Sequence, residues 1–493
     1  MLHQRGAGVL MHISSLPSPY GIGVFDRHAR DFIDRIADMG FTYWQVLPFN
    51  PIDGAGSPYC SPSAFAGNYL FIDPQGLQDM GLATAEEVAA NHYDGTPYTA
   101  DFAFAGERRL ALLEQAFLRI DDTLAAKIKA FEVENPWLTD YSVFMAVKEA
   151  EGGKPWWQWS DRHAHYHTCI QDIYAYESRA AFWKFVQYIF YLQWGNIKAY
   201  ANEKGVAVLG DMPIYVAMDS ADVWANQHLF QLDSKGYPTR VAGVPPDYFS
   251  ASGQLWGNPL YNWEAHEAEH FSWWISRIRA QLYNLDILRV DHFRGFEAFW
   301  SIPYGEPTAV NGEWVKAPGH ALFSAVRDAF EGNLPIIAED LGIITPEVEA
   351  LRDEFGFPGM KVLQFAFDSL DEGSYLPHRY TSPVCVCYTG THDNDTTRSW
   401  YQTLRPECRD KVRRYTHCSN DTHFPLDLIG TALASVAAYA IFPLQDVLCV
   451  GAEGRMNTPG IGAGNWSWRY QQSALKGELA DELRGMTILY GRY

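Results

Sequence analysis

Four carboxylates stand at or just beyond the ends of short apolar, β-branched runs of the sequence. Asp211, Asp291 and Glu339 each end such a run, and Asp393 follows shortly after another. If these runs are parallel strands of one closed barrel, their carboxyl ends meet at one rim and bring the four acids together. Carboxylates that converge in a pocket repel one another, so that some of them titrate abnormally. One acid can then be ionised while another stays protonated, which acid–base chemistry at a single bond requires.

Other kinds of active site leave weaker traces in the sequence. His163, His165 and His167 alternate along a polar segment, which indicates a solvated surface, with a metal site as the weaker alternative. No glycine-rich loop is followed by Lys and Ser or Thr, as nucleotide binding would require, and no serine or cysteine hydrolase elbow is present. An acid pair acting on a neutral, ring-shaped substrate remains, which means transfer or hydrolysis at a glycosidic bond. Neither a metal nor a cofactor is expected.

The positions of the acids suggest a division of roles between them. Arg289 stands two residues before Asp291 on the same strand face, and its charge lowers the pKa of that carboxyl, so we interpret Asp291 as the nucleophile. Glu339 ends an otherwise apolar run, where desolvation raises the pKa, which suits the general acid/base. Asp393 can accept hydrogen bonds from sugar hydroxyls and hold the ring distorted towards an oxocarbenium ion.

Hydrophobic periodicity identifies the elements that must position these acids. Eight short apolar runs alternate with segments whose apolar residues recur every three or four positions, which predicts an α/β protein with a (β/α)8, or TIM, barrel. The expected strands are 8–11, 43–47, 206–211, 287–291, 335–339, 360–365, 384–388 and 440–444. The expected helices include 26–39, 180–204, 266–283, 319–330 and 346–355.

The strands are unevenly spaced along the chain. About 160 residues separate the second expected strand from the third, far more than one crossover helix needs. We therefore predict one elaborated barrel over 1–493, with a mainly helical insertion at 51–180 and a loop-rich insertion at 212–265 that covers the active site. No separate C-terminal β-domain is expected. Both insertions leave the carboxyl ends of strands, the face on which barrel enzymes build their sites.

Composition narrows the classes of partner. The 493 residues include 38 basic and 59 acidic side chains, and the net charge of −21 argues against nucleic acid and anionic membranes. Seven thinly spread cysteines do not suggest a disulfide scaffold or a zinc site. Neither a leader peptide nor an 18-residue apolar span is evident, so we expect a cytoplasmic protein. Aromatic residues make up 15% of the chain, enough for a large core and for some rings that stack on sugars.

Ten collinear motifs, from about residue 6 to the C-terminal region, resemble the 4-α-glucanotransferases of glycoside hydrolase family 77, the amylomaltases. They include YWQVLPFNP, SPYCSPSAFAGN, GDMPIYVAMDSADVW, LRVDHFRGF, IAEDLGIITPEV, YTGTHDNDT and MNTPGIGAGNWSWR. This family belongs to the α-amylase clan, whose retaining mechanism uses two displacements at one anomeric carbon. The chain resembles the short type of relative, without an N-terminal extension.

The resemblance implies the same three catalytic roles for Asp291, Glu339 and Asp393. It also implies substrate-binding residues in two groups. Around the reacting glucose and on the donor side these are Arg289, Asp211, His392, Tyr59, which stacks on the donor sugar, and Asp368. In the loop over the acceptor side they are Asp247, Tyr248, Phe249, Gln254, Trp256 and Asn258. Cys60 departs from the family pattern, since relatives often carry Gln beside the tyrosine.

The acceptor-side loop suggests how transfer is separated from hydrolysis. We expect residues 247–256 to form a lid that orders on acceptor binding and excludes water, with Gly243, Gly253 and Gly257 as hinges. The resemblance then implies transfer of α-1,4-glucan segments from a maltodextrin or starch chain to the 4-hydroxyl of glucose or another glucan. The partners would be maltooligosaccharides, starch or glycogen-derived glucans, and glucose. The alternatives are an α-glucan hydrolase of the same clan and a catalytically silent glycan-binding protein.

Overall fold

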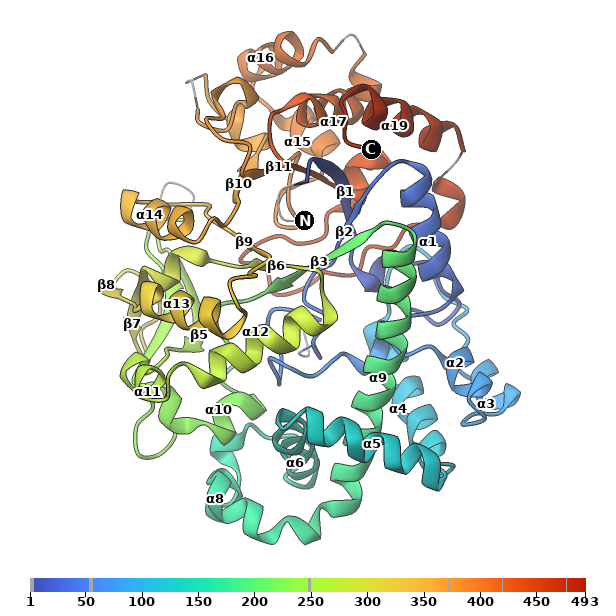
Figure 1. Ribbon diagram of the computed structural model, residues 1–493, viewed down its shortest axis with the longest axis vertical. Helices are drawn as coiled ribbons and strands as arrows, with labels where there is room; N and C mark the ends of the chain where they lie inside the picture. The colour runs from blue at the N-terminus through green and yellow to red at the C-terminus, as the bar shows by residue number, and fades with distance from the viewer. Residues whose placement is uncertain (1–3, 53–55, 247–249, 371–372, 419, 476) are drawn as a thin grey trace.

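The fold centres on one eight-stranded parallel sheet (Figure 1). The computed structural model describes residues 4–52, 56–246, 250–370, 373–418, 420–475 and 477–493. In spatial order, the sheet runs β10-β11-β12-β1-β2-β3-β6-β9. Its strands are β1 (Gly6–Leu10), β2 (Tyr43–Gln45), β3 (Ala207–Met212), β6 (Ile287–Val290), β9 (Ile336–Ala338), β10 (Gly359–Val362), β11 (Cys385–Tyr388) and β12 (Tyr439–Pro443).

Backbone hydrogen bonding closes this sheet into a barrel. The amide of Ala338, at the end of β9, donates to the carbonyl of Pro358, just before β10, at 2.9 Å. All the neighbouring strands are parallel, and each lies within or next to one of the eight apolar runs. The predicted (β/α)8 barrel is therefore confirmed. The described residues that follow β12 form helices and loops.

The barrel strands are mainly apolar because both of their faces are buried. In β6, Ile287 belongs to the cluster inside the barrel, whereas Leu288 and Val290 pack outwards against the helices. Arg289 therefore shares the inner face with Ile287, since side chains alternate along a strand. In the register of the sheet Arg289 lies opposite Asp211 of β3. This pairing carries a charged pair into the barrel interior just below its rim.

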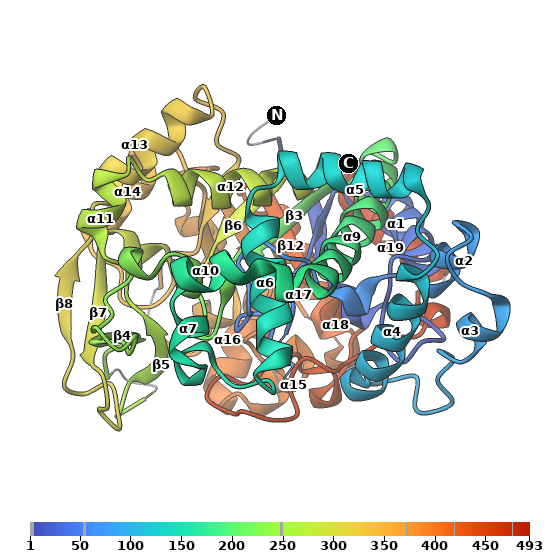
Figure 2. The same cartoon turned by 90° about the horizontal axis from the view of Figure 1, so that it is seen from below.

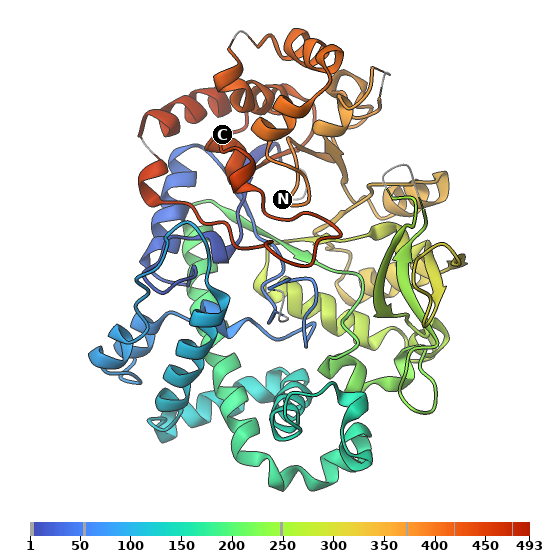
Figure 3. The same cartoon turned by 180° about the vertical axis from the view of Figure 1, so that it is seen from behind.

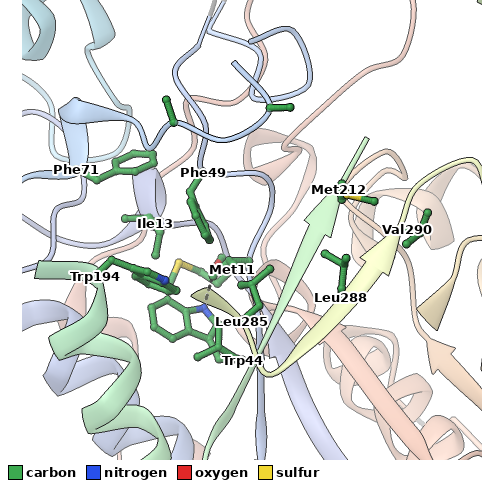
Figure 4. Close-up of a cluster of buried hydrophobic side chains, with 14 of the residues drawn as sticks. Met11, Ile13, Trp44, Phe49, Phe71, Trp194, Met212, Leu285, Leu288 and Val290 are labelled. Carbon is green, nitrogen blue, oxygen red and sulfur yellow. Dashed lines mark hydrogen bonds between the residues drawn. The ribbon is translucent and has the colours of Figure 1, made fainter. Parts of the chain in front are cut away.

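Outside the barrel, bulky side chains join the strands to the long helix α9 (Glu177–Glu203). The Trp44 ring of β2 contacts Trp194 of α9 with 6.3 Å between ring centroids, and its Nε1 donates to the carbonyl of Met11 at 2.9 Å. Figure 4 shows these rings with Ile13, Phe49 and neighbouring side chains in one buried cluster. The cluster fixes the carboxyl ends of β1 and β2, from which segments lead towards the site.

The chain between β2 and β3 forms loops and helices in its described residues. Its helices lie below the barrel in Figure 1 and are seen from below in Figure 2. They precede α9 and are α2 (Pro74–Asp79), α3 (Ala85–Ala89), α4 (Phe102–Phe117), α5 (Asp122–Glu134), α6 (Trp137–Ala150), α7 (Asp161–Ala164) and α8 (Tyr166–Cys169).

A second, antiparallel sheet stands beside the barrel and was not predicted. Its order is β5-β4-β7-β8, with β4 (Arg240–Val244), β5 (Gln254–Pro259), β7 (Ala298–Pro303) and β8 (Glu313–Lys316). The segment read as loop-rich, 212–265, thus contains two strands. The hydrophobic pattern does not reveal them, because the residues of β5 and β8 are largely exposed and β4 pairs with β7, a strand remote in sequence.

The remaining helices flank the barrel strands or complete the C-terminal region. In Figure 3 the red segment that precedes α19 crosses the middle of the molecule. No helix in the described parts of the chain is long and apolar enough to cross a membrane. These helices are α1 (Arg27–Asp38), α10 (Ala221–Ala225), α11 (Trp263–Ala268), α12 (Ser272–Asn284), α13 (Gly319–Ala329), α14 (Pro346–Glu354), α15 (Thr397–Thr403), α16 (Pro406–Thr416), α17 (Phe424–Ala434), α18 (Leu444–Val447) and α19 (Gly477–Leu489).

Candidate active site

One guanidinium nitrogen joins two of the predicted acids at the end of the barrel. Nη1 of Arg289 lies 2.6 and 2.7 Å from the two carboxylate oxygens of Asp211 and 2.9 Å from Oδ1 of Asp291. The Asp211 side chain is fully buried, whereas the Asp291 side chain keeps 29% of its surface exposed. Asp211 is therefore a buried ion-pair partner of Arg289, whereas Asp291 remains accessible to a ligand.

Glu339 is held by backbone amides. It follows β9, the neighbour of β6. Its Oε2 accepts a hydrogen bond from the amide of His292 at 2.7 Å, and its Oε1 accepts one from the amide of Leu341 at 2.9 Å. His292 directly follows Asp291, so the chain itself places the two acids side by side.

Burial and charge together perturb the titration of this group. Burial raises the pKa of Asp291, and the positive charge of Arg289 opposes that rise. The pKa of Glu339 is raised more strongly, by burial and then by the negative charge of Asp291. Burial would lower the pKa of Arg289, but Asp211 and Asp291 hold it well above its usual value. Asp291 therefore loses its proton at lower pH than Glu339, which is the order that a nucleophile and an acid require.

Asp393 lies across the opening, on the loop after β11. Its Oδ1 accepts a hydrogen bond from Nδ2 of Asn457 at 2.6 Å, and its carbonyl accepts one from Arg455 at 3.2 Å. Nε2 of His392 lies 3.4 Å from Oδ2 of Asp393. About half of the Asp393 side chain remains exposed. A ligand in the opening can therefore reach this carboxylate.

Aromatic rings form one wall of the site. Tyr59 stacks on His392 with 5.3 Å between ring centroids, and Trp466 contacts both rings. The Tyr59 hydroxyl donates to Oδ2 of Asp211 at 2.8 Å and lies 2.9 Å from Nε2 of His392. The Tyr59 ring is thus fixed to the same charged cluster that holds Asp291.

Part of this group lines a cavity of about 470 Å³ at the carboxyl end of the barrel, whereas Glu339, Arg289 and Asp211 are not among the described residues that line it. The volume suits a small part of a polymeric ligand, with the rest extending outwards. The predicted residues that line this cavity are Tyr59, Gln254, Trp256, Asn258, Asp291, His392 and Asp393, with Cys60 beside Tyr59.

The acceptor-side residues that can be described lie on β5. Nε1 of Trp256 donates to Oε1 of Gln254 at 3.1 Å, and Nδ2 of Asn258 donates to the carbonyl of Val216 at 2.9 Å. The other three residues predicted for this loop, Asp247, Tyr248 and Phe249, lie outside the described residues.

Asp368 lies apart from the cavity. Its Oδ1 accepts a hydrogen bond from Nε1 of Trp400 on α15 at 3.0 Å, and it does not line the cavity among the described residues. Its predicted contact with donor hydroxyls remains a prediction.

Several residues at the site were not singled out from the sequence. Asn457 and Arg455 hold Asp393, Trp466 supports the aromatic wall, and Tyr215 and His292 contact Trp256. Asn457 and Trp466 stand in the motif MNTPGIGAGNWSWR, but no strand or helix pattern places that segment at the barrel. Among the described residues, no group of three or more His, Cys, Asp or Glu is placed to hold a metal ion.

A closed parallel barrel whose rim carries an arginine-paired acid beside a second acid of raised pKa is typical of the class of enzymes that act on glycosidic bonds with two carboxylates. Comparison with known proteins specifies the family. The sequence profile of glycoside hydrolase family 77, described as 4-alpha-glucanotransferase, matches residues 11–475. The chain belongs to this family of transferases.

Relatives match over almost the whole chain. The 4-alpha-glucanotransferase of Synechocystis is 46% identical over 503 aligned residues, covering 100% of this chain and 99% of the relative. That of Thermus thermophilus is 46% identical and covers 98% of each chain. The solved structure of the Streptococcus agalactiae amylomaltase in complex with acarbose is 37% identical, with a TM-score of 0.95 and coverage of 99% of this chain and 100% of that one.

Proposed function

We propose that this protein transfers α-1,4-glucan segments from a maltodextrin or starch chain to the 4-hydroxyl of glucose or of another glucan, by a retaining double displacement. The observation that carries the mechanism is the contrast between the two neighbouring acids. Asp291 shares an arginine nitrogen with a buried carboxylate, whereas Glu339 accepts hydrogen bonds from two backbone amides and from no arginine of the described structure. The complex of the similar S. agalactiae amylomaltase with acarbose supports an oligosaccharide ligand.

In the first displacement, protonated Glu339 gives its proton to the glycosidic oxygen of the donor. A carboxylate oxygen of Asp291 attacks the anomeric carbon, and the bond from that carbon to the leaving oxygen breaks. The part of the donor on the leaving side departs with a free 4-hydroxyl. The rest of the donor remains as a glycosyl ester of Asp291, and Glu339 is left ionised.

In the second displacement, ionised Glu339 takes the proton from the 4-hydroxyl of an acceptor. That oxygen attacks the anomeric carbon, and the ester bond to Asp291 breaks. Two inversions at one carbon restore the α-configuration, and Glu339 is protonated again. Broken and formed bonds are of the same kind, so the enzyme redistributes chain lengths without a co-reactant.

The other residues of the site hold the reacting ring in this account. Asp393 accepts hydrogen bonds from ring hydroxyls as positive charge develops at the anomeric carbon, and Asn457 fixes the orientation of its carboxylate. Tyr59 presents an aromatic face to the donor sugar. The guanidinium of Arg289 keeps Asp291 ionised while the site is dry.

Transfer requires that the glycosyl enzyme meet a sugar before it meets water. We propose that the hairpin of β4 and β5 carries the lid that does this, because it brings Trp256 to the cavity and leaves Leu255 and Trp256 about 40% exposed in the free protein. An acceptor glucan would cover this exposed strand and displace water from the ester.

We also propose a cytoplasmic location. The seven cysteines all lie within the described residues, and none of them forms a disulfide. This state suits a compartment that keeps thiols reduced.

Incubation with maltotriose tests the proposed activity. We expect glucose together with a ladder of longer maltodextrins, because each glycosyl enzyme is resolved by another sugar. Glucose and maltose alone would indicate a hydrolase, and binding without turnover would indicate a glycan-binding protein. Asp291→Asn should lower kcat/KM by more than about 10⁴-fold and Glu339→Gln by about 10²- to 10⁴-fold. Folded variants with wild-type rates would contradict the mechanism.

A further inference from the structure

His292 connects the predicted acid/base to the predicted lid. It directly follows Asp291 and adopts the left-handed backbone conformation, with φ 50° and ψ 50°. Such a conformation is uncommon for a residue that is not glycine and marks a position that the surrounding structure enforces. Glycine would adopt this conformation without steric cost, so the presence of a histidine suggests that its side chain is needed here.

The left-handed turn aims two successive amides at one residue. The amide of His292 donates to the Glu339 carboxylate at 2.7 Å, and the amide of Phe293 donates to the Glu339 carbonyl at 3.0 Å. The φ and ψ angles of His292 set the relative orientation of the two peptide planes on either side of its Cα, so with φ in the common negative range both amides could not reach Glu339 at once. Glu339 would then lose one of these two donors, and the His292 amide is the only donor that the described residues provide for its Oε2.

The ring of His292 faces the lid. Trp256 of β5 stands edge-on to this ring at 85°, with 4.9 Å between the centroids. Below it, a Cβ at Gly295 would lie 3.2 Å from Cδ2 of the ring and 2.7 Å from Ile214, so the space there is closely filled. Nε2 of His292 is buried without a hydrogen-bond partner among the described residues. Burial lowers the pKa of His292 to about 4, so the ring is neutral at working pH.

We propose that His292 is a positioning residue with two separate parts: its backbone amide orients the Glu339 carboxylate, and its ring packs against Trp256 and holds that residue of the acceptor lid in place. The inference builds on the proposed function. The neutral ring takes no part in proton transfer. One residue thereby ties the position of the acid/base to the strand that meets the acceptor.

Substitutions can separate the two parts, because backbone conformation and ring are removed by different changes. Gly and Asn tolerate the left-handed conformation but lack the ring, whereas Val disfavours that conformation strongly. His417, the exposed C-cap of α16, has φ 57° and lies away from the cavity lining. His417→Val therefore imposes a similar backbone strain and serves as the matched control.

The first measurement is the pH profile of kcat/KM with maltotriose. The charged and titratable groups that face Glu339 in the described structure are Asp291, Arg289 and Tyr375. None of these groups is changed in the His292 variants, so a shift of the basic limb of the pH profile indicates that the hydrogen bond from the residue 292 amide to Glu339 is lost. We expect His292→Val to lose about 100-fold in kcat/KM and to move the basic limb to higher pH, since a donor that favours ionised Glu339 is gone. Maltosyl fluoride needs no protonation of its leaving group, so the rate of fluoride release in a single turnover should be affected much less in His292→Val.

The second measurement is the ratio of transfer to hydrolysis. We expect His292→Gly and His292→Asn to keep the basic limb in place but to lower this ratio by about 2- to 10-fold, as for the loss of one aromatic contact. His417→Val should change neither the limb nor the ratio. Circular dichroism and a melting curve establish whether each variant is folded.

Two results would overturn the inference. If folded Gly and Val variants share one pH profile, the backbone part is wrong; if the Gly variant keeps the wild-type ratio, the ring part is wrong. If His292→Val does not fold, the transfer-to-hydrolysis ratios of His292→Gly and His292→Asn still test the contact between the ring and Trp256. The pH profile of His292→Ala, which disfavours the left-handed conformation less than Val does, then tests the role of the backbone. Glu339→Gln, measured in the same assays, shows whether a negative result concerns His292 alone or the proposed function. If Glu339→Gln keeps wild-type activity, the acid/base role of Glu339 is wrong; if it loses activity, only the role of His292 is in question.

Discussion

At the scale of single residues, Asp291 and Glu339 have different partners although they lie side by side. Asp291 shares Nη1 of Arg289 with Asp211, and Glu339 is held by two amides. Burial raises the pKa of both acids, and the charge of Asp291 raises that of Glu339 further. The site therefore holds one proton between the two acids over the range between their pKa values.

This arrangement predicts a bell-shaped pH profile of kcat/KM. Activity rises as Asp291 loses its proton and falls as Glu339 loses its own, because the nucleophile must be ionised and the acid protonated. The profile with maltotriose should show both limbs. In Glu339→Gln the remaining activity should keep the acidic limb and lack the basic one. A basic limb that persists in this variant would assign it to another group.

Arg289 provides a second test at this scale. Arg289→Gln removes the charge that opposes protonation of Asp291, so the acidic limb should move to higher pH. Stability should fall by about 3–5 kcal/mol, because buried Asp211 loses its ionic partner. Urea unfolding and the pH profile measure the two effects. Arg289→Lys should restore part of both, and Arg414→Gln, which changes an exposed residue of α16, should change neither.

At the scale of elements, the site depends on the carboxyl ends of β3, β6 and β9 and on loops whose positions the strand pattern does not predict. The barrel strands could be predicted because both of their faces are buried, which leaves runs of mainly apolar residues, three of which end in an acid. The position of Asn457 could not be predicted, because its loop has neither strand nor helix periodicity. His292 gave no signal either, since a left-handed conformation at a histidine has no sequence signature.

The loop after α18 should act through Asp393. Asn457→Ala removes the donor to the Asp393 carboxylate, and Asn457→Asp replaces it with a like charge. We expect kcat for maltotriose to fall by about 10-fold in the Ala variant, roughly the worth of one hydrogen bond to a charged group, and further in the Asp variant, while KM changes little. A rise in KM at constant kcat would instead assign Asn457 to ground-state binding.

The hairpin of β4 and β5 should control the fate of the glycosyl enzyme. Gly253 has φ +65°, and a Cβ there would lie 2.4 Å from the carbonyl oxygen of Val244. Gly253→Ala must therefore distort the turn, and we expect a lower ratio of transfer to hydrolysis with maltotriose. Gly356→Ala has a similar positive φ of +68° without such a contact among the described residues, and should leave the ratio unchanged. Equal ratios in both variants would count against the lid.

At the scale of the whole molecule, length and patterning predicted one barrel with insertions, and the barrel is confirmed. The antiparallel sheet was missed because its strands are short, partly exposed and paired across distant parts of the sequence. Four acids at strand ends could be placed together in advance, because parallel strands in a closed barrel share one rim. The contacts between individual side chains could not be predicted, because they depend on strand register and loop conformation.

The net charge of −21 has a consequence at this scale. A neutral glucan gains nothing from the field of the protein, so the rate with maltotriose should vary little up to about 0.5 M salt, where surface charges are screened. DNA and heparin should not inhibit. Steady-state rates over a salt series test this. A steep salt dependence would show that a charged ligand or partner takes part.

The central claim is that transfer proceeds through a glycosyl ester on Asp291. Its most direct test is mass spectrometry of the Glu339→Gln variant after brief incubation with maltosyl fluoride, which needs no proton to react but leaves an ester that the variant resolves slowly. The account predicts a mass increase of one maltosyl group, located by peptide mapping at Asp291. An adduct on another residue, or turnover of the donor with no covalent adduct at any time, would contradict it.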